Sequence, residues 1–387
     1  MKKPNQPKRV IIIVLSILLV SLIFSFWLLS QKPVISVSSS SEDWPMFHRD
    51  LTHTGHSNSL APLTADILWK FDGGHVIWAS PAVVNGHVFI ASDDTQIYCL
   101  DALTGEQVWR YRTKNAIGSS TAVAGGHVYV GSYDHNIYCL DASTGAKIWS
   151  FNTGDIVQSS PAIADGYVYV GSWDGNLYCL NAQTGIKIWN YSTGGLIESS
   201  PVISDGMVYF GSTDSNVYCL DGLSGEEIWS YKTGNVIQSS AAVNGDYLYI
   251  GSEDNNLYCL NATSGEKIWS YLTQGWVDSS PAIADGYVYV GSWDGDNNVY
   301  CLDALTGSKI WNYTTKEGVN SSPGIADGYV YVGSWDGTLY CLDALSGEKI
   351  WSYTTGSHIN SSPAVVRGIV YVGSWDHNVY AFGIPSD

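Results

Sequence analysis

The chain has 387 residues and a formal net charge of −18, with 40 Gly, 26 Tyr and 16 Trp but only 3 Met. Aromatic residues favour strands and Gly favours tight turns, so this composition predicts a β-rich body. Five of the 18 basic residues and none of the 36 acidic ones fall within residues 1–32, which leaves the remainder strongly acidic. Such a surface repels phosphate backbones and excludes nucleic acid as an expected partner.

The N-terminal residues differ from the rest. Residues 1–9 form a basic tail, and residues 10–30 contain Val10–Leu29, a run of 20 residues interrupted only by Ser. This length is enough to cross a hydrocarbon core of about 30 Å, whereas a cleavable signal peptide has an apolar region of about 7–15 residues. We therefore expect a transmembrane anchor in preference to a signal peptide, followed by a Ser-rich stalk at 31–42. Because the basic tail stays in the cytoplasm, the sequence predicts a single-pass cell-membrane protein with its main body on the extracytoplasmic side.

A repeat of about 40 residues begins at residue 67. One copy, at 159–193, reads SSPAIADGYVYVGSWDGNLYCLNAQTGIKIWNYST, and 279–315 is nearly identical. The Tyr-Cys-Leu signature places its cysteines at 99, 139, 179, 219, 259, 301 and 341, and the one longer step contains the insertion Asp296-Asn297. An eighth copy ends in Tyr-Ala-Phe at 380–382, so the sequence predicts eight structural units.

Each copy predicts four short strands, at 159–163, 167–172, 177–181 and 187–191 in the first example. Asp165-Gly166 suits a two-residue hairpin that needs positive φ. The second and third strands are apolar on both faces, as in a sheet packed between two other layers. Propeller blades have this pattern, whereas a two-sheet sandwich leaves one face of each sheet exposed to water.

The two ends of the repeat region are complementary. Ile67–Phe71 is a fourth strand without its own blade, and the last copy lacks a fourth strand. Pairing them would complete the eighth blade and remove two exposed edges. The sequence therefore predicts an all-β, eight-bladed β-propeller of four-stranded antiparallel blades over residues 67–387.

The pattern Tyr-x-Leu-Asp-Ala-x-Thr-Gly-x-x-x-Trp, as in Tyr98–Trp109 and Tyr138–Trp149, resembles the tryptophan-docking repeat of PQQ-like propellers. That family includes quinoprotein dehydrogenases and BamB-type propellers of outer-membrane assembly. Gly-Ser-Trp-Asp also suggests WD40 repeats, but the Thr-Gly-x-x-x-Trp after the third strand favours the PQQ-like type. Residues 43–66 are similar to the family's N-terminal strap. The resemblance implies that Trp109 and its equivalents lock neighbouring blades.

Three groups of reactive side chains receive structural interpretations. The seven Cys lie at one blade position and thus on different spokes, too far apart for disulfides, so we expect small buried hydrophobes. His48, His53 and His56 offer imidazoles for zinc or copper, but no Cys or Glu completes a site, and we expect no metal there. Asp294, Asp296 and Asn297 offer oxygens for calcium, but the closing Glu of a calcium loop is missing, which favours turn chemistry.

Catalysis is disfavoured. The resemblance implies that a dehydrogenase would show an adjacent Cys-Cys pair, a calcium-binding set and a catalytic Asp, and the sequence has no Cys-Cys. Its acidic residues mostly recur at equivalent blade positions, whereas an active site needs different residues converging on one point. We therefore expect no catalytic, cofactor-binding or metal-binding residues. The alternative is a PQQ-dependent dehydrogenase that holds its quinone and calcium at the channel.

Two positions differ from blade to blade, and both belong on one rim of the propeller. The entrance positions precede the innermost strands: Trp78, Gly118, Gln158, Glu198, Gln238, Asp278, Asn320 and Asn360. The turn positions follow Gly-Ser after the second strands, or Ala-Ser in the first copy: Asp93, Tyr133, Trp173, Thr213, Glu253, Trp293, Trp335 and Trp375.

Exposed aromatic residues at such turns are favoured anchors for partners, although Trp in duplicated blades also packs on neighbours. The candidate partner face consists of Trp78, Tyr133, Gln158, Trp173, Glu198, Asp278, Trp293, Asn320, Trp335, Asn360 and Trp375. The expected function is that of a non-catalytic, membrane-anchored scaffold or receptor for a protein, peptide or glycan.

Overall fold

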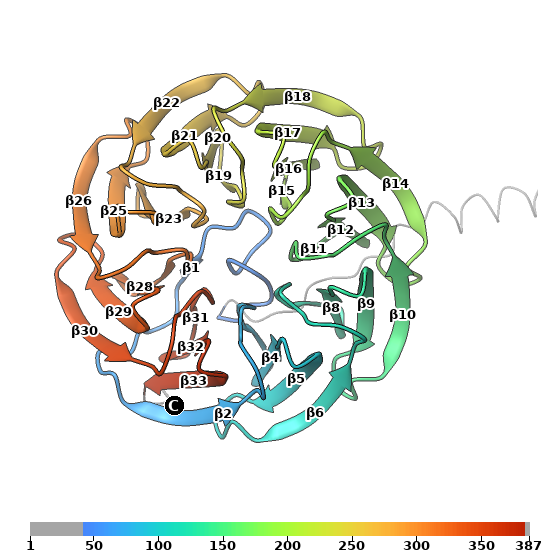
Figure 1. Cartoon of the computed structure of the whole chain (residues 1–387), viewed down its shortest axis with the longest axis horizontal. Helices are drawn as coiled ribbons and strands as arrows, with labels where there is room; N and C mark the ends of the chain where they lie inside the picture. Colours follow the sequence, from blue (N-terminus) through green and yellow to red (C-terminus); the bar gives the residue numbers. More distant parts are fainter. Residues whose placement is uncertain (1–41, 384–387) are drawn as a thin grey trace, which may run out of the picture. The chain divides into compact units, whose positions relative to one another are not determined.

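The computed structural model describes residues 42–383, in which eight antiparallel sheets stand as blades around a central axis (Figure 1). The predicted eight-bladed propeller is therefore confirmed. The basic tail, the anchor and all of the stalk except Glu42 lie outside the described residues. Within 42–383, no helix is long and apolar enough to cross a membrane.

Each blade has an inner strand A, then strands B and C, and an outer strand D. The A strands of blades 1 to 8 are β3 (Ala82–Val84), β7 (Ala122–Ala124), β11 (Ala162–Ala164), β15 (Val202–Ser204), β19 (Ala242–Asn244), β23 (Ala282–Ala284), β27 (Gly324–Ala326) and β31 (Ala364–Val366). The B strands are β4 (His87–Ala91), β8 (His127–Gly131), β12 (Tyr167–Gly171), β16 (Met207–Gly211), β20 (Tyr247–Gly251), β24 (Tyr287–Gly291), β28 (Tyr329–Gly333) and β32 (Ile369–Gly373).

The C strands are β5 (Gln96–Asp101), β9 (Asn136–Asp141), β13 (Asn176–Asn181), β17 (Asn216–Asp221), β21 (Asn256–Asn261), β25 (Asn298–Asp303), β29 (Thr338–Asp343) and β33 (Asn378–Gly383). The D strands are β6 (Gln107–Arg112), β10 (Lys147–Asn152), β14 (Lys187–Ser192), β18 (Glu227–Lys232), β22 (Lys267–Leu272), β26 (Lys309–Thr314), β30 (Lys349–Thr354) and, for blade 8, β2 (Ile67–Asp72). A two-residue strand, β1 (His56–Ser57), pairs in parallel with β27.

The local chemistry of blade 3 shows why the repeat folds in this way. Asp165 and Gly166 have φ of 49° and 82°, the left-handed conformations that a tight A–B hairpin requires. The central residues of β12 and β13 are buried on both faces, because each blade packs between two others. A register shift between Cys179 and Leu180 bends the outer edge of the blade.

The predicted limits of strand A are wrong at its start: the strand in blade 3 spans Ala162–Ala164, and the preceding Ser-Ser-Pro lies outside it. The reason is that the second Ser forms a hydrogen bond with the neighbouring blade. The backbone N–H of Ser160 donates to Oγ of Ser200 in the next blade, 3.0 Å away.

The same bond joins every pair of neighbouring blades and closes into a ring, from Ser80 through Ser120, Ser160, Ser200, Ser240, Ser280, Ser322 and Ser362 back to Ser80. We call these eight residues the serine ring.

The docking tryptophans join the blades at their outer edge, as the resemblance implied. Trp109 is 8% exposed, and its indole Nε1 donates to the carbonyl oxygen of Ala142 in the next blade at 2.9 Å. Gly145 lies under the same ring, where a Cβ would come within 2.6 Å of the indole. Blade 8 has no C–D turn to offer such a carbonyl, and Pro62 replaces it: Nε1 of Trp351 donates to its oxygen at 3.0 Å.

The ring closes as the complementary ends predicted. β2 pairs antiparallel with β33, so residues near both ends of the chain share blade 8 (Figure 1). This pairing removes two free strand edges. Trp69 of β2 then docks on the carbonyl oxygen of Ala102 in blade 1, at 2.9 Å.

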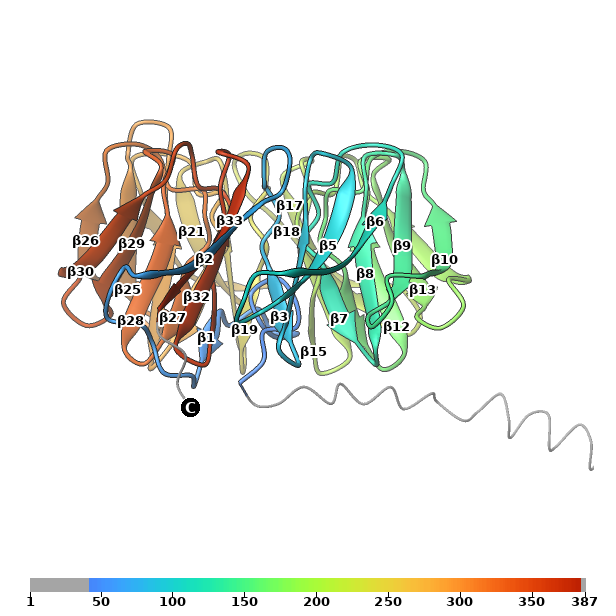
Figure 2. The same cartoon turned by 90° about the horizontal axis from the view of Figure 1, so that it is seen from below.

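The strap crosses the central channel before the first blade begins. It bonds in turn to the inner strands, through the backbone pairs Trp44–Val83, Pro45–Val123, Leu51–Ile203, Thr52–Val243, Thr54–Ile283 and Gly55–Ile325. The chain enters on the face of the A–B turns, where Glu42 forms an ion pair of 3.2 Å with Arg367 (Figure 2). The strap therefore enters the channel from the face opposite the D–A and B–C connections.

Candidate binding site at the channel mouth

All eight entrance positions line one depression on the face of the D–A and B–C connections, which we call the mouth. Its cavity volume is about 260 Å³. Below the entrance positions lies the serine ring, and Phe47 of the strap also lines the mouth. The mouth is therefore the place where the residues that distinguish one blade from another converge.

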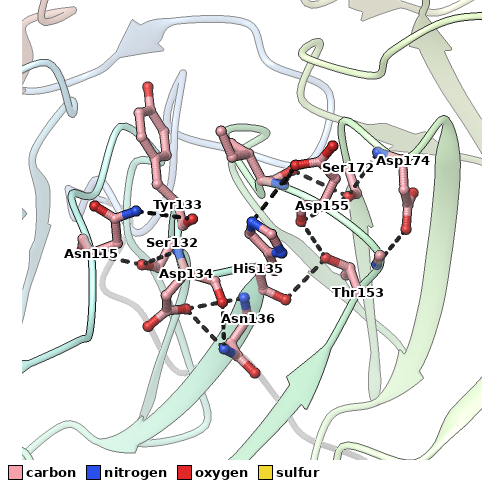
Figure 3. Close-up of polar contacts among 12 residues, drawn as sticks. Asn115, Ser132, Tyr133, Asp134, His135, Asn136, Thr153, Asp155, Ser172 and Asp174 are labelled. Atoms are coloured by element: carbon pink, nitrogen blue, oxygen red, sulfur yellow. Dashed lines mark hydrogen bonds and ion pairs between the residues drawn. The ribbon is translucent and has the colours of Figure 1, made fainter.

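The B–C turns that carry the turn positions are held by a repeated hydrogen-bond network (Figure 3). In blade 2, Oδ1 of Asp134 accepts the backbone N–H of Asn136 at 3.1 Å, and Oδ2 accepts the Tyr138 hydroxyl at 2.7 Å. Figure 3 shows the Tyr133 side chain directed away from this network. The turn thus fixes the backbone and leaves its first side chain free for another role.

These repeated turn carboxylates are structural. Burial raises the pKa of Asp174, but hydrogen bonds from the Tyr178 hydroxyl, the Gly154 backbone and Asn176 outweigh it, and the net pKa is lowered. Asp134, Asp214 and Asp376 are also lowered, with burial again opposed by the hydrogen bonds of their turns. A carboxyl with so many donors is held in its ionised form and has no spare acceptor capacity for a ligand.

Four tryptophans form a continuous row along the rim. The ring centroids of Trp293 and Trp335 are 5.1 Å apart, those of Trp335 and Trp375 are 5.6 Å apart, and those of Trp375 and Trp78 are 4.3 Å apart. His358 stacks on Trp335 at 5.1 Å and meets the edge of Trp375 at 5.0 Å. All five side chains are half-buried.

Trp276 packs edge-on against Trp293 at 5.5 Å. We call these six residues, from blade 6 through blades 7 and 8 to blade 1, the aromatic arc. Three of its indoles belong to the turn positions and one to the entrance positions, so the two sets that were predicted to share one rim are in direct contact here.

An indole-bound carboxyl stands at each end of the arc. In blade 6, Nε1 of Trp293 at the turn position donates to Oδ2 of Asp278 at the entrance position, at 2.7 Å. In blade 1 the two residue types are exchanged, and Nε1 of Trp78 donates to Oδ2 of Asp93 at 3.0 Å. In both carboxyls, Oδ1 is buried and has no hydrogen-bond partner within residues 42–383. Each end of the arc therefore presents an oriented acceptor with unused capacity.

Three acids of blades 4, 5 and 6 adjoin the arc, and we call Glu198, Glu253 and Asp278 the acidic sector. The pKa of Asp278 is raised to about 7, chiefly by burial; the Trp293 hydrogen bond lowers it, and like-charge repulsion from Glu253, Glu198 and Asp294 raises it. Burial also raises the pKa of Glu198, with a further contribution from Glu253. Unlike the turn acids, these half-buried carboxyls repel one another, and the single hydrogen bond from Trp293 to Asp278 does not offset the burial of that carboxyl.

The remaining candidate residues have definite places on the same rim. The Tyr133 hydroxyl donates to Oε1 of Gln158 at 3.1 Å, and its ring lies 6.4 Å from that of Trp173. Nε1 of Trp335 donates to Oδ1 of Asn360 in the next blade. Three further polar atoms of the rim are buried without a partner in the described part of the chain: Nε1 of Trp173, Nε1 of Trp375 and Oδ1 of Asn320.

The sequence alone did not single out Trp276 and His358 of the aromatic arc or Phe47 of the mouth. Trp276 and His358 occupy one blade position, two residues before the entrance position, and Val76, Ala116 and Ile156 are among its other occupants. The blade-to-blade variation used for the other two positions would have found them. Phe47 gives no such signal, because only the path of the strap brings it to the mouth.

The cysteines and Asp296 have the structural roles that were predicted for them. All seven Cys are buried and free, and burial raises each thiol pKa to about 12. Asp296 accepts hydrogen bonds from Ser292, Asn298, Tyr300 and the Gln274 backbone, which is the role of a turn acid.

The strap histidines do not converge on one point with carboxylates. His48 donates from Nδ1 to the carbonyl oxygen of His53 at 3.3 Å, and burial lowers the pKa of His48 to about 4 and that of His53 to about 3. His56 is half-buried, and burial lowers its pKa as well. No group of three or more His, Cys, Asp or Glu residues suited to a metal ion occurs between residues 42 and 383.

Comparison with known proteins agrees with the fold. Residues 55–155, 133–240, 213–318 and 294–384 match the sequence model of the family described as outer membrane protein assembly factor BamB. No curated protein matches the sequence.

Several solved structures share the fold. A europium-containing methanol dehydrogenase has a TM-score of 0.80 at 14% identity, covering 91% of this chain and 100% of its own. BamB from Moraxella catarrhalis has a TM-score of 0.72 at 21% identity, covering 83% and 98%. The quinohemoprotein alcohol dehydrogenase from Comamonas testosteroni has a TM-score of 0.78 at 15% identity, covering 92% and 83%. At these identities the likeness concerns the fold alone.

Proposed function

The chain belongs to the family described as outer membrane protein assembly factor BamB, and on that premise we propose that it is a non-catalytic binding propeller that takes a polypeptide or glycan partner at the mouth. The observation that carries this proposal is the convergence at the mouth of every entrance position, bordered by the aromatic arc. Aromatic side chains at a concave surface supply large contact area at low conformational cost. The repeated residues elsewhere are occupied in joining blades and closing turns.

The alternative, a PQQ-dependent dehydrogenase, has less support from the residues present. PQQ is a tricarboxylate, and a site for it needs cationic side chains or a metal ion to balance that charge. In the described part of the chain, the residues that line the mouth include Glu198 and Asp278 but no Lys or Arg. Burial already raises the pKa of both carboxyls, and like-charge neighbours raise it further, so an anionic cofactor would meet more repulsion. We infer that the mouth does not suit this cofactor.

The proposed setting is the extracytoplasmic face of the cell membrane, with residues 10–30 as an uncleaved anchor. The length of Val10–Leu29 supports it. Glu42 lies beside the A–B turn of blade 8, on the face opposite the mouth, so the mouth is turned away from the point where the chain enters the propeller. Mass spectrometry of membrane-extracted protein should recover peptides from residues 1–30. A mature N-terminus between residues 30 and 42 would replace the anchor with a cleaved signal peptide.

Site-directed photo-crosslinking tests the proposed binding face. The full-length chain would carry a photoreactive phenylalanine in place of Trp335 of the aromatic arc or, as the control in the same blade, in place of Leu345. Leu345 is 68% exposed in the C–D turn on the opposite face. We expect a discrete adduct in native membranes from position 335 and none from position 345. The adduct should disappear when Trp293 and Trp375 are both changed to Ala, and equal crosslinking from the two positions would contradict the proposal.

A further inference from the structure

We propose that the mouth is a receptor site for an organic cation, the ammonium or guanidinium group of a Lys or Arg side chain that a polypeptide partner inserts between the acidic sector and the aromatic arc. This inference rests on the proposed function and names the chemistry of its ligand.

The negative charge at the mouth favours a cationic ligand. Glu198 and Asp278 line the depression, and Glu253 lies close enough to raise the pKa of both by like-charge repulsion. These three residues come from three successive blades, so no local turn accounts for their being together. Among residues 42–383, no Lys or Arg lines the mouth to neutralise them. A cation entering here would relieve repulsion that the protein alone leaves uncompensated, and a neutral ligand would not.

Two carboxyl oxygens at the ends of the aromatic arc have unused hydrogen-bonding capacity. Oδ1 of Asp278 is buried and has no donor within residues 42–383, although Trp293 holds the other oxygen at 2.7 Å. Oδ1 of Asp93, at the other end of the arc, is in the same state. Buried carboxylate oxygens normally have partners. Ammonium and guanidinium groups carry several donors and no acceptor, which is the complement these oxygens lack.

The size of the cavity and the apolar surface beside it favour a single Lys or Arg side chain. The cavity volume of about 260 Å³ falls below the range of roughly 300–1,000 Å³ found for sites that enclose drug-sized ligands. It suits a single long side chain. Lys and Arg have apolar stems that pack on aromatic surface while their heads meet acids, and Trp is the strongest cation–π partner. The aromatic arc beside the acidic sector offers both contacts.

A polypeptide is favoured over a free amine because of the extent of the rim. The arc runs across blades 6, 7, 8 and 1, and Tyr133 and Trp173 continue it on blades 2 and 3. A free amine would contact only the cavity. A chain that presents a basic side chain would also cover the half-buried indoles on both sides, including Nε1 of Trp173 and of Trp375, which have no partner among residues 42–383.

Titration calorimetry on the full-length chain in detergent, at pH 8, is the test. The probes are acetyl-Tyr-Lys-Tyr-amide, the same peptide acetylated at Nζ, n-butylammonium, and a neutral chitin trisaccharide. We expect the Lys peptide to bind at least ten-fold more tightly than its acetylated form and than n-butylammonium, with no binding of the trisaccharide. Asp278→Asn should weaken the Lys peptide at least ten-fold, whereas Asp205→Asn, an equal change of charge in an exposed A–B turn on the opposite face, should leave its affinity unchanged.

A pH series adds an independent readout. The groups that face Asp278 are Glu198, Glu253 and Asp294, with Trp293 donating to it. Because its pKa is about 7, Asp278 is mostly protonated at pH 5.5 and mostly ionised at pH 8, while the Lys probe stays charged throughout. Affinity for the Lys peptide should therefore fall at least five-fold from pH 8 to pH 5.5. The Asp278→Asn variant should lose most of this dependence.

The outcomes of these titrations distinguish the proposed ligand from the other ligand classes. Equal affinity for the Lys peptide and its acetylated form, or an Asp278→Asn variant that is folded and binds normally, overturns the cation assignment. Equal affinity for n-butylammonium assigns the site to a small amine and overturns the polypeptide part. Tight binding of the trisaccharide would identify a glycan site. Crosslinking at position 335 that the Lys peptide does not compete away would leave the proposed function standing while this inference fails.

Discussion

The indole Nε1 of Trp293 donates a 2.7 Å hydrogen bond to Oδ2 of Asp278, which leaves Oδ1 of that carboxyl buried and without a donor among the described residues. Burial, with a smaller contribution from the negative charges of Glu253 and Glu198 in blades 5 and 4, raises the pKa of Asp278 to about 7. A carboxyl in this state opposes folding whenever it is ionised. Such a destabilising carboxyl fits a role in binding, because residues that serve binding commonly lower the stability of the folded state.

Asp278→Asn should therefore stabilise the protein, and only above acidic pH. The folded pKa of about 7 lies above the ordinary value of 3.8, so the native state loses stability as pH rises from about 4 through about 7. We expect the variant to gain about 2–4 kcal/mol in the free energy of unfolding at pH 8 and nothing at pH 4. Urea titrations of both proteins at the two pH values measure this.

The matched control is Asp174→Asn in a B–C turn, where the folded pKa is lowered by hydrogen bonds from Tyr178, Gly154 and Asn176. This variant should lose stability at pH 8. If both variants shift in the same direction, the division of the acids into structural and ligand-facing groups is wrong.

The contact between docking Trp and Gly can be isolated with two alanine variants. Gly185 and Gly206 both have positive φ, of +69° and +78°. A Cβ on Gly185 would lie 2.7 Å from the Trp149 ring, whereas one on Gly206 would meet nothing within 4 Å. Gly206→Ala should cost about 1–2 kcal/mol of backbone strain, and Gly185→Ala about 1–3 kcal/mol more through overpacking. Chemical denaturation measures both, and equal losses would show that the indole yields freely.

The serine ring should contribute to stability at the join between the last and first blades. Ser80→Ala removes the acceptor that the buried N–H of Ser362 uses at 2.9 Å. A buried donor without a partner costs about 1–3 kcal/mol. Ser224→Ala, which removes two exposed bonds, one accepted from Glu226 at 3.3 Å and one donated to Asp221 at 3.0 Å, should change the free energy of unfolding by about 0.5 kcal/mol or less. Similar values for the two variants would mean that water replaces the lost acceptor in the ring.

The seven thiols should be silent in the native protein. All are buried, and burial holds each pKa at about 12, so almost no thiolate forms at pH 8. An aromatic disulfide reagent should label none of them over the time in which it labels all seven in denaturant without reductant. Fewer than seven equivalents after denaturation would reveal a disulfide and overturn the assignment of the cysteines to separate spokes.

The sequence determined the parts of this protein whose physics is local. Asp165-Gly166 specifies a hairpin by backbone conformation, the apolar B and C strands specify a sheet packed on both faces, and Trp109 with Gly145 specifies how one blade meets the next. Because these features recur at a fixed spacing, the blade count and the pairing of the two ends also followed from the sequence.

Only the tertiary structure decided what lies across the ring. Pro62 supplies the carbonyl oxygen that blade 8 lacks, and the Ser before each strand A hydrogen-bonds to the neighbouring blade. Both features depend on distances between segments that are far apart in the chain. The raised pKa of Asp278 depends in the same way on its burial and on Glu198 and Glu253, which lie in other blades. A residue's identity gives its charge, but the free energy of holding that charge depends on the surrounding dielectric and neighbours, which closure of the ring alone establishes.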